Sequence, residues 1–240
     1  MKFKSALTEA VFLKRYYQFL AEVGINNDKK RIIYCPNLGN LAHCDVLGSR
    51  AWFSNPLRLS EGYLDTWELV EVNGGWLVCI NPLYTPILVQ EGIDSGIITE
   101  LKEFQFLKTP VIPNTKEGIQ LLLKENGEQC FIQLETVLLA DDRNEGYFPG
   151  AKGEGFSNLF DLIALRESGH RAVLIYCIQH NGIQVVRPAD TIDPEYGKVL
   201  REAVSKGVEV LAYKTTIDLN EIKLDTKVPV LLSENTSCAR

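Results

Sequence analysis

The chain has 240 residues, of which 45% are hydrophobic and 23% are charged, so it is long enough for one large domain or two small ones with real cores. This composition excludes a disordered chain. The formal net charge is −6, from 25 Lys and Arg residues against 31 Asp and Glu residues. An acidic total disfavours a protein that grips duplex DNA through phosphates over its whole surface, although a local basic face remains compatible with it.

The cysteines are scattered along the chain, without a C-x-x-C motif and without a His at metal-ligand spacing. They are Cys35, Cys44, Cys79, Cys130, Cys177 and Cys238. Most lie in apolar runs, which predicts buried, reduced thiols in a cytoplasmic protein. No apolar segment approaches the length that would span a membrane, so no membrane partner is expected.

The first half of the sequence is typical of short β-strands. Strand-like runs separated by Gly, Asn and Pro cover residues 19–23, 31–35, 49–53, 67–72 and 76–80. Asn73-Gly74 supplies the positive φ values of a tight hairpin between the last two runs. Several short strands at this spacing predict a small barrel or sandwich. A helix is expected over residues 85–93, with Pro86 in its first turn.

The second half alternates between strands and helices. Strands are expected over residues 119–123, 130–138, 171–179 and 208–213, and helices over 156–167 and 193–206. Asp193 caps the second helix, and Gly169 and Gly207 follow the two helices where helices commonly end. This alternation predicts a sheet with flanking helices. The Pro-rich stretch 107–114 is the expected boundary between two domains, 1–106 and 107–240.

Several motifs occur in a fixed order over some two hundred residues: Phe12-Leu13-Lys14-Arg15-Tyr16, Cys35-Pro36-Asn37 with Gly39, Thr66-Trp67-Glu68-Leu69, Gly146-Tyr147-Phe148-Pro149, Gly169-His170-Arg171 and Ile192-Asp193-Pro194. In these motifs the chain resembles the sugar fermentation stimulation (SfsA) family. The resemblance implies an N-terminal OB-like β-barrel with a trailing helix, followed by a restriction-endonuclease-like (PD-(D/E)XK-type) α/β domain, a mixed α+β and α/β fold. It also implies a DNA-binding protein linked to the regulation of sugar use.

In such a nuclease core, the resemblance implies an Asp on one strand of a hairpin, then a Glu and a Lys two positions apart on the next strand. Here these three positions hold Gln120, Gln133 and Glu135. Mg²⁺ is bound through one or two carboxylates, whereas an amide offers a neutral carbonyl. Other site positions of the family fall on Pro110, Gly150, Glu154 and Asn158. We therefore expect no metal, no other cofactor and no catalytic residue at these positions. Gln120, Gln133 and Glu135 are interpreted as half-buried polar groups.

Cations interleaved with aromatic residues are the candidate nucleic-acid contacts: Lys14, Arg15, Tyr16, Asn37, Arg50, Trp52 and Arg58. On an OB-type face such residues would pair with the backbone and stack on bases. The alternative is that the aromatic rings belong to the barrel core and the cations to a solvated surface. Both interpretations stay open.

Other polar residues indicate no site of their own. His43, His170 and His180 are too scattered for a His-based centre, and Asp141-Asp142 beside Arg143 is typical of a solvated turn.

Three hypotheses follow. The first is a catalytically inactive SfsA-like scaffold that binds nucleic acid weakly, or a protein or small-molecule partner. The second is a DNA-binding regulator of sugar metabolism. The third is a metal-dependent nuclease with a rearranged site that uses Glu135.

Overall fold

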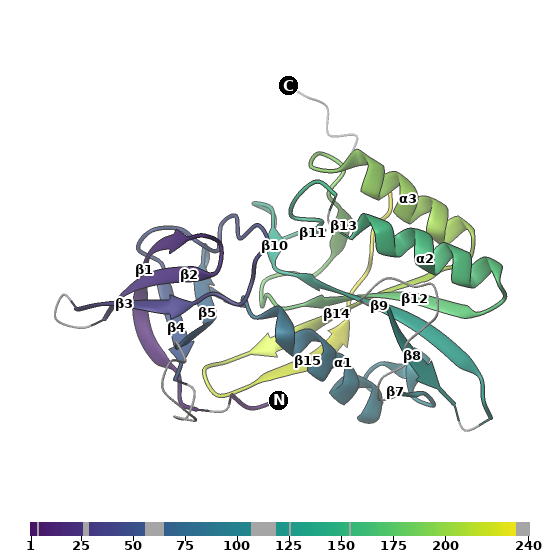
Figure 1. Cartoon of the computed structure of the whole chain (residues 1–240), viewed down its shortest axis with the longest axis horizontal. Coiled ribbons are helices and arrows are strands. Elements are labelled where there is room, and N and C mark those ends of the chain that lie inside the picture. Colours follow the sequence, from purple (N-terminus) through teal and green to yellow (C-terminus); the bar gives the residue numbers. More distant parts are fainter. Residues whose placement is uncertain are drawn as a thin grey trace.

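The computed structural model describes residues 1–3, 5–25, 29–55, 65–106, 119–124, 126–153 and 155–233, and of residues 120–123 the backbone alone. It shows a mixed α+β chain built on three β-sheets (Figure 1). Several sequence predictions lie outside the described residues: Arg58, Pro110, Glu154, Cys238, the side chain of Gln120 and the boundary at 107–114.

The N-terminal sheet has the strand order β3-β2-β1-β4-β5-β6. Its strands are β1 (Thr8–Tyr16), β2 (Leu20–Ile25), β3 (Lys29–Tyr34), β4 (Arg50–Ser54), β5 (Thr66–Val72) and β6 (Trp76–Cys79). One further parallel pairing, Tyr34 with Thr66, joins β3 to β5. Phe12 stacks on Trp67 at a centroid distance of 4.8 Å inside this sheet's core. The hairpin predicted around Asn73-Gly74 is confirmed, with φ of 87° at Gly74.

The second large sheet has the order β15-β14-β12-β9-β8-β7, and its three central strands run parallel. Its strands are β7 (Gln105–Phe106), β8 (Ile119–Leu123), β9 (Gln129–Val137), β12 (Arg171–Ile178), β14 (Glu209–Ile217) and β15 (Ile222–Lys227). A small third sheet joins β10 (Leu139–Ala140), β11 (Gly146–Phe148) and β13 (Val186–Pro188).

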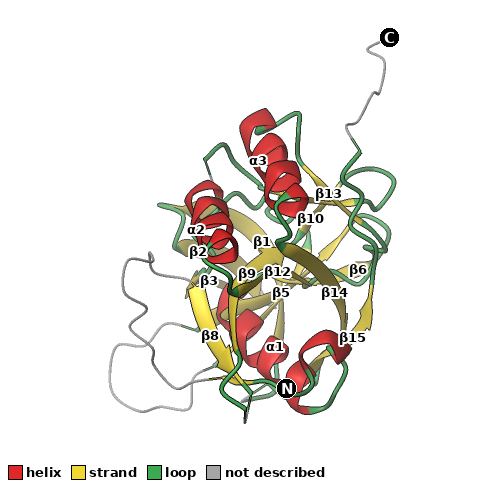
Figure 2. Ribbon diagram, turned by 90° about the vertical axis from the view of Figure 1, so that its right-hand side faces the viewer, coloured by secondary structure: helices red, strands yellow, loops and turns green. Residues whose placement is uncertain are grey.

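Helices cover both faces of the second sheet. Figure 2 shows α2 (Phe156–Glu167) and α3 (Pro194–Ser205) on one side of β9, β12 and β14, and α1 (Thr85–Asp94) on the other. The alternation of side chains along β12 explains this arrangement, since Leu174 and Tyr176 pack toward α2 and α3, while Val173 and Ile175 pack toward α1. Short 3₁₀ helices, η1 (Pro82–Tyr84) and η2 (Thr99–Leu101), flank α1.

The division of the chain at residue 107 stays a prediction. The helix that this division assigns to the first domain packs on the second sheet, because Leu88, Val89 and Ile93 of α1 share a core with Cys130 of β9 and Val173 of β12.

The two large sheets meet along β6. Cys79 N–H donates to the carbonyl of Gln179 at 3.0 Å, and Asn181 N–H donates to the carbonyl of Leu77 at 3.0 Å. In the orientation that satisfies both ends of its amide, Gln179 donates to the carbonyls of Cys79 and Asn81 and accepts from Thr85 Oγ1.

A buried polar chain extends on both sides of Gln179. Thr85 Oγ1 lies 2.6 Å from Thr136 Oγ1 of β9, and Asn81 Nδ2 donates to Glu68 Oε2 of β5 at 2.8 Å. Ser54 Oγ donates to the other oxygen of Glu68 at 2.7 Å. Hydrogen bonds therefore connect the N-terminal sheet with β9 without interruption.

The described cysteines Cys35, Cys44, Cys79, Cys130 and Cys177 are buried and free of disulfide bonds, as predicted. Burial raises the pKa of the Cys44 thiol to about 12, so this thiol stays protonated near neutral pH. None of the helices in the described residues is long and apolar enough to cross a membrane.

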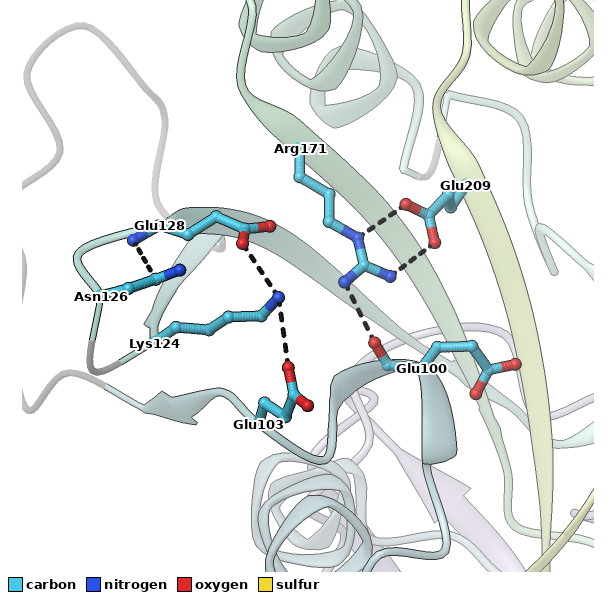
Figure 3. Close-up of polar contacts among 7 residues, drawn as sticks. All are labelled: Glu100, Glu103, Lys124, Asn126, Glu128, Arg171 and Glu209. Carbon is cyan, nitrogen blue, oxygen red and sulfur yellow. Dashed lines mark hydrogen bonds and ion pairs between the residues drawn. The ribbon is translucent and has the colours of Figure 1, made fainter.

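An ionic cluster ties η2 to the amino ends of the parallel strands (Figure 3). Arg171 donates to both carboxylate oxygens of Glu209, at 2.7 and 2.8 Å, and to the carbonyl of Glu100 at 3.0 Å. The Glu100 carboxylate accepts from Lys227 Nζ and from Tyr213 Oη, each at 2.6 Å. Burial opposes ionisation of Glu100, but these hydrogen bonds outweigh it and lower its pKa to about 2.

Replacing Glu100 by Gln should lower the free energy of unfolding by about 1–2 kcal/mol at pH 7, because Lys227 and Tyr213 lose a charged acceptor at a partly exposed site. A carboxylate with a lowered folded-state pKa stabilises the fold above its ordinary value of 4.5, and this contribution is lost as the pH falls toward 2. The difference in the free energy of unfolding between wild type and variant, measured by urea denaturation, should therefore shrink as the pH falls from 4.5 toward 2.

Glu103→Gln is the matched control, since the Glu103 carboxylate is mostly exposed and lies 3.5 Å from Lys124. Its effect should stay below about 0.5 kcal/mol. Equal effects of the two substitutions would contradict the role given to Glu100.

Candidate functional site

Gln133 and Glu135 lie two positions apart on β9, and both face α2. Gln133 is 5% exposed, and its Nε2 donates to Glu135 Oε1 at 3.1 Å and to the carbonyl of Leu134 at 3.3 Å. The amide oxygen of Gln133 is buried and has no hydrogen-bond partner among the described residues. The predicted pair is thus brought together, with the nitrogen of the amide facing the carboxylate.

The start of α2 packs directly on Glu135. Gly155 is the N-cap of α2 and has φ of 71°. A Cβ at this position would lie 2.8 Å from Phe148 Cε1 and 3.2 Å from Glu135 Oε1, so glycine is required here both by the backbone conformation and by space. The amino end of a helix carries partial positive charge, which favours a neighbouring carboxylate.

The loop that leads into α2 is anchored from α3 and from the N-terminal sheet. Asp193, the N-cap of α3, accepts from the backbone N–H of Tyr196 at 3.1 Å and of Gly153 at 2.7 Å. The bond from Gly153, followed by others, lowers the pKa of Asp193 against the opposing effect of burial. Asn40 Nδ2 donates to the carbonyl of Gly150 at 2.8 Å.

These residues do not fit a hard divalent cation of the Mg²⁺ type. Such an ion needs converging oxygens and one or two carboxylates, whereas Gln133 turns its nitrogen, not its oxygen, toward Glu135. In the β8–β9 pairing Gln120 lies opposite Ile132, and its side chain is outside the description. Within the described ranges, no group of three or more His, Cys, Asp or Glu side chains is arranged to hold a metal ion.

Four of the candidate nucleic-acid residues lie together near the β1–β2 turn. Arg15 donates to the carbonyls of Gln18, Gly39 and Asn37, at 2.9, 3.0 and 2.5 Å, so its guanidinium holds the 37–39 loop in place. Asn37 Oδ1 accepts from Gly39 N–H. Lys14 Nζ lies 4.9 Å from the centre of the Tyr16 ring, and Tyr16 Oη donates to Glu22.

Arg50 and Trp52 form a separate group on β4. Val11 of β1 is the register partner of Arg50, five residues or about 16 Å from Tyr16 along the strand. Arg50 is paired with Glu9 at 3.1 Å and with Glu71 at 3.0 Å. Trp52 is 2% exposed and packs in a core, which is the alternative that the sequence left open for this ring.

The exposed aromatic side chains at the β1–β2 turn are more accessible than the two aromatic residues singled out from the sequence, Tyr16 and Trp52. Tyr17 is 81% exposed and Phe19 is 45% exposed, and their rings stack at 6.2 Å. Tyr17 and Gln18 both have positive φ, 49° and 67°. Tyr34, the register partner of Leu20, is also exposed. Tyr17 stands beside Tyr16 in the sequence, but its exposure depends on the turn and could not be read from the residue pattern.

Comparison with known proteins places the chain in a family. Residues 84–221 match the profile of the sugar fermentation stimulation protein RE domain. The sugar fermentation stimulation protein homolog of a Marinomonas species is 38% identical over 234 residues, covering 97% of this chain and 91% of that protein. The chain belongs to the SfsA family. The homolog of Shewanella frigidimarina is 39% identical over 221 residues, covering 90% of this chain and 94% of that SfsA relative.

A solved SfsA structure agrees with the fold. The structure of Pyrococcus furiosus SfsA in complex with Ca²⁺ is 20% identical and gives a TM-score of 0.85, covering 96% of this chain and 98% of that one. At this identity the match shows the shared SfsA fold alone, and it confirms the mixed α+β prediction.

Gly155→Ala should destabilise this SfsA-family protein by about 2–4 kcal/mol, because the new methyl group meets Phe148 and Glu135 and the backbone is held at positive φ. Gly153→Ala is the matched control, since it has φ of 83° with nothing within 4 Å of the added Cβ, and should cost about 1 kcal/mol. Thermal and urea unfolding measure both. Equal losses would show that the packing of α2 on Glu135 contributes nothing.

Proposed function

We propose that this SfsA-family protein is not a nuclease and serves as a binding scaffold that holds single-stranded nucleic acid weakly on its N-terminal sheet. The observation that carries the first half of the proposal is the hydrogen bond from Gln133 to Glu135. Where the family resemblance implies an acidic ligand and a lysine, this chain pairs an amide with a carboxylate. The two side chains are joined by a hydrogen bond and offer neither the charge for a metal nor a cation for the attacking water.

Titration calorimetry with Mg²⁺ and Mn²⁺ should detect no binding by the wild-type protein, and single- and double-stranded DNA should remain uncut. The variant carrying Gln120→Asp, Gln133→Glu and Glu135→Lys restores the charges that the resemblance implies and should gain Mn²⁺ binding. Gln133→Glu alone is the control, because it places a second carboxylate beside Glu135 without introducing the lysine. Cleavage by wild type that Glu135→Gln abolishes would falsify the proposal in favour of a rearranged nuclease.

The second half of the proposal rests on charge and exposed rings. The strands β1, β2 and β3 carry five cationic side chains against two acidic ones, a local excess of three in a chain of net charge −6. The cations are Lys14, Arg15, Lys29, Lys30 and Arg31, and the acids are Glu9 and Glu22. The pairing order of β1 to β5, with β3 joined to β5, supports an OB-like barrel. In such a barrel the surface formed by β1, β2 and β3 is suited to binding single-stranded nucleic acid.

Tyr17→Ala and Phe19→Ala should each weaken the binding of a short oligothymidylate by at least about fivefold at low salt, because each removes a ring on which a base can stack. Phe160→Ala, on α2, is the matched control, since Phe160 is exposed to the same degree as Phe19 but lies on the other sheet's helix layer. Fluorescence anisotropy measures all three.

Loss of affinity in Phe160→Ala equal to that in Phe19→Ala, or no wild-type binding at low salt, would remove the nucleic-acid half of the proposal. Tight duplex binding with a steep salt dependence would instead favour a DNA-binding regulator.

A further inference from the structure

A second site lies where the β5–β6 hairpin meets the connection that follows β9. A cavity of about 270 Å³ opens there between residues of four separate segments. Its lining includes Trp76, Leu138, Leu139, Asp141, Asp142 and His180. This volume is just below the range of about 300–1,000 Å³ that is usual for pockets of drug-sized ligands, so a smaller molecule suits it.

One wall of the cavity is an aromatic ring held in place but left accessible. Trp76 is 38% exposed, although it belongs to a strand. A Cβ on Gly182 would lie 2.9 Å from Trp76 Cδ1, and a Cβ on Gly74 would lie 3.0 Å from Trp76 Nε1. The indole therefore occupies space that two glycines leave open, and it is positioned before any ligand arrives.

His180 lines the same cavity and carries a hydrogen-bond donor. It is 4% exposed, forms a β-bridge with Val78, and its Nδ1 accepts from the Gly182 N–H at 2.9 Å. Because Nδ1 is the acceptor, the proton of the neutral ring is on Nε2, and Nε2 has no partner among the described residues. Burial lowers the pKa of His180 to about 4, so the ring is a neutral donor at pH 7.

The rim of the cavity is acidic. Asp141 Oδ1 accepts from the backbone N–H of Arg143 and of Glu145, both at 2.9 Å, which fixes the turn. Asp142 is exposed on that turn. A second cavity of about 370 Å³ shares Asp141 and Asp142. It adds Arg187, which is paired with Glu145, and Asp190, which is paired with Arg201, so Asp141 and Asp142 set its net charge. An anionic group would meet a net negative charge on both sides of the turn.

We propose that this cavity binds an amino-substituted nucleobase or its nucleoside, without a phosphate. The planar ring stacks on Trp76, a ring nitrogen or carbonyl accepts from His180 Nε2, and the neighbouring amino group donates to Asp142. Such an edge presents an acceptor to the buried donor of His180 and a donor to Asp142. An arginine side chain has donors alone and leaves His180 unsatisfied. The acidic rim selects against nucleotides.

Calorimetry or ligand-observed NMR with adenosine tests the proposal. Wild-type protein should bind adenosine with a dissociation constant below about 1 mM. It should bind adenosine 5′-monophosphate at least about fivefold more weakly, because the phosphate is repelled by the acidic rim. Trp76→Leu should weaken adenosine binding at least about tenfold. Asp142→Asn should weaken it about fivefold and narrow the difference between nucleoside and nucleotide.

Asp94→Asn, an exposed acid on α1 outside the cavity, is the control and should leave adenosine binding unchanged. Circular dichroism of each variant checks that it is folded. Absence of saturable binding, equal affinity for the nucleotide, preference for an arginine amide, or full affinity in a folded Trp76→Leu protein would each overturn the proposal. The site is independent of the oligothymidylate surface, so adenosine binding should persist in Tyr17→Ala and Phe19→Ala.

Discussion

The relative placement of the two large sheets depends on one buried amide. Gln179 is fully buried at the end of β12, and it satisfies its two polar ends only because β6 and the start of α1 come to it from different parts of the chain. An unsatisfied buried polar group costs about 1–3 kcal/mol, so displacing β6 would break several bonds at once. The polar chain reaches Thr136, directly after Glu135 but on the opposite face of β9. Both the Gln133–Glu135 pair and the cavity beside Trp76 lie next to this junction.

The Gln133–Glu135 pair shows how the polypeptide itself can stabilise a half-buried carboxylate. Glu135 would be an isolated negative charge in a half-buried place, but a neighbouring amide and the amino end of α2 both favour it. The loop before α2 is anchored through Asp193 and Asn40, which holds this wall of the site in place.

Much of the fold was predictable because its signals are local. The range 156–167 predicted for a helix agrees with α2, and the Asp193 cap and the Asn73-Gly74 turn are where their residue types indicated. Strands β1 and β15 and the short strands β7, β10, β11 and β13 were missed. The four short strands have only two or three residues each, which is too few for an alternating pattern to show. The packing of α1 on the second sheet is also non-local, and a resemblance that runs along the chain does not reveal it.

The sites were predictable to a smaller extent. Gln133 and Glu135 could be named from the family resemblance. Alternation along one strand places them on one face, which allows their mutual hydrogen bond. Trp52, a candidate contact by its sequence, is buried in a core, whereas Tyr17 is exposed at the β1–β2 turn. Trp76 and His180 are about one hundred residues apart, and no periodicity connects them; only the β6 junction makes them neighbours.

The β1–β2 turn carries two successive residues in the left-handed region, Tyr17 and Gln18, where Asn-Gly would adopt the same backbone with less strain. Sequences under selection for stability alone would drift toward such an easier turn. Directed evolution of this protein for heat resistance alone should therefore replace this dipeptide early, and in doing so would erase the ring that the turn presents to solvent. Thermostable descendants would then be poor guides to what the natural surface recognises.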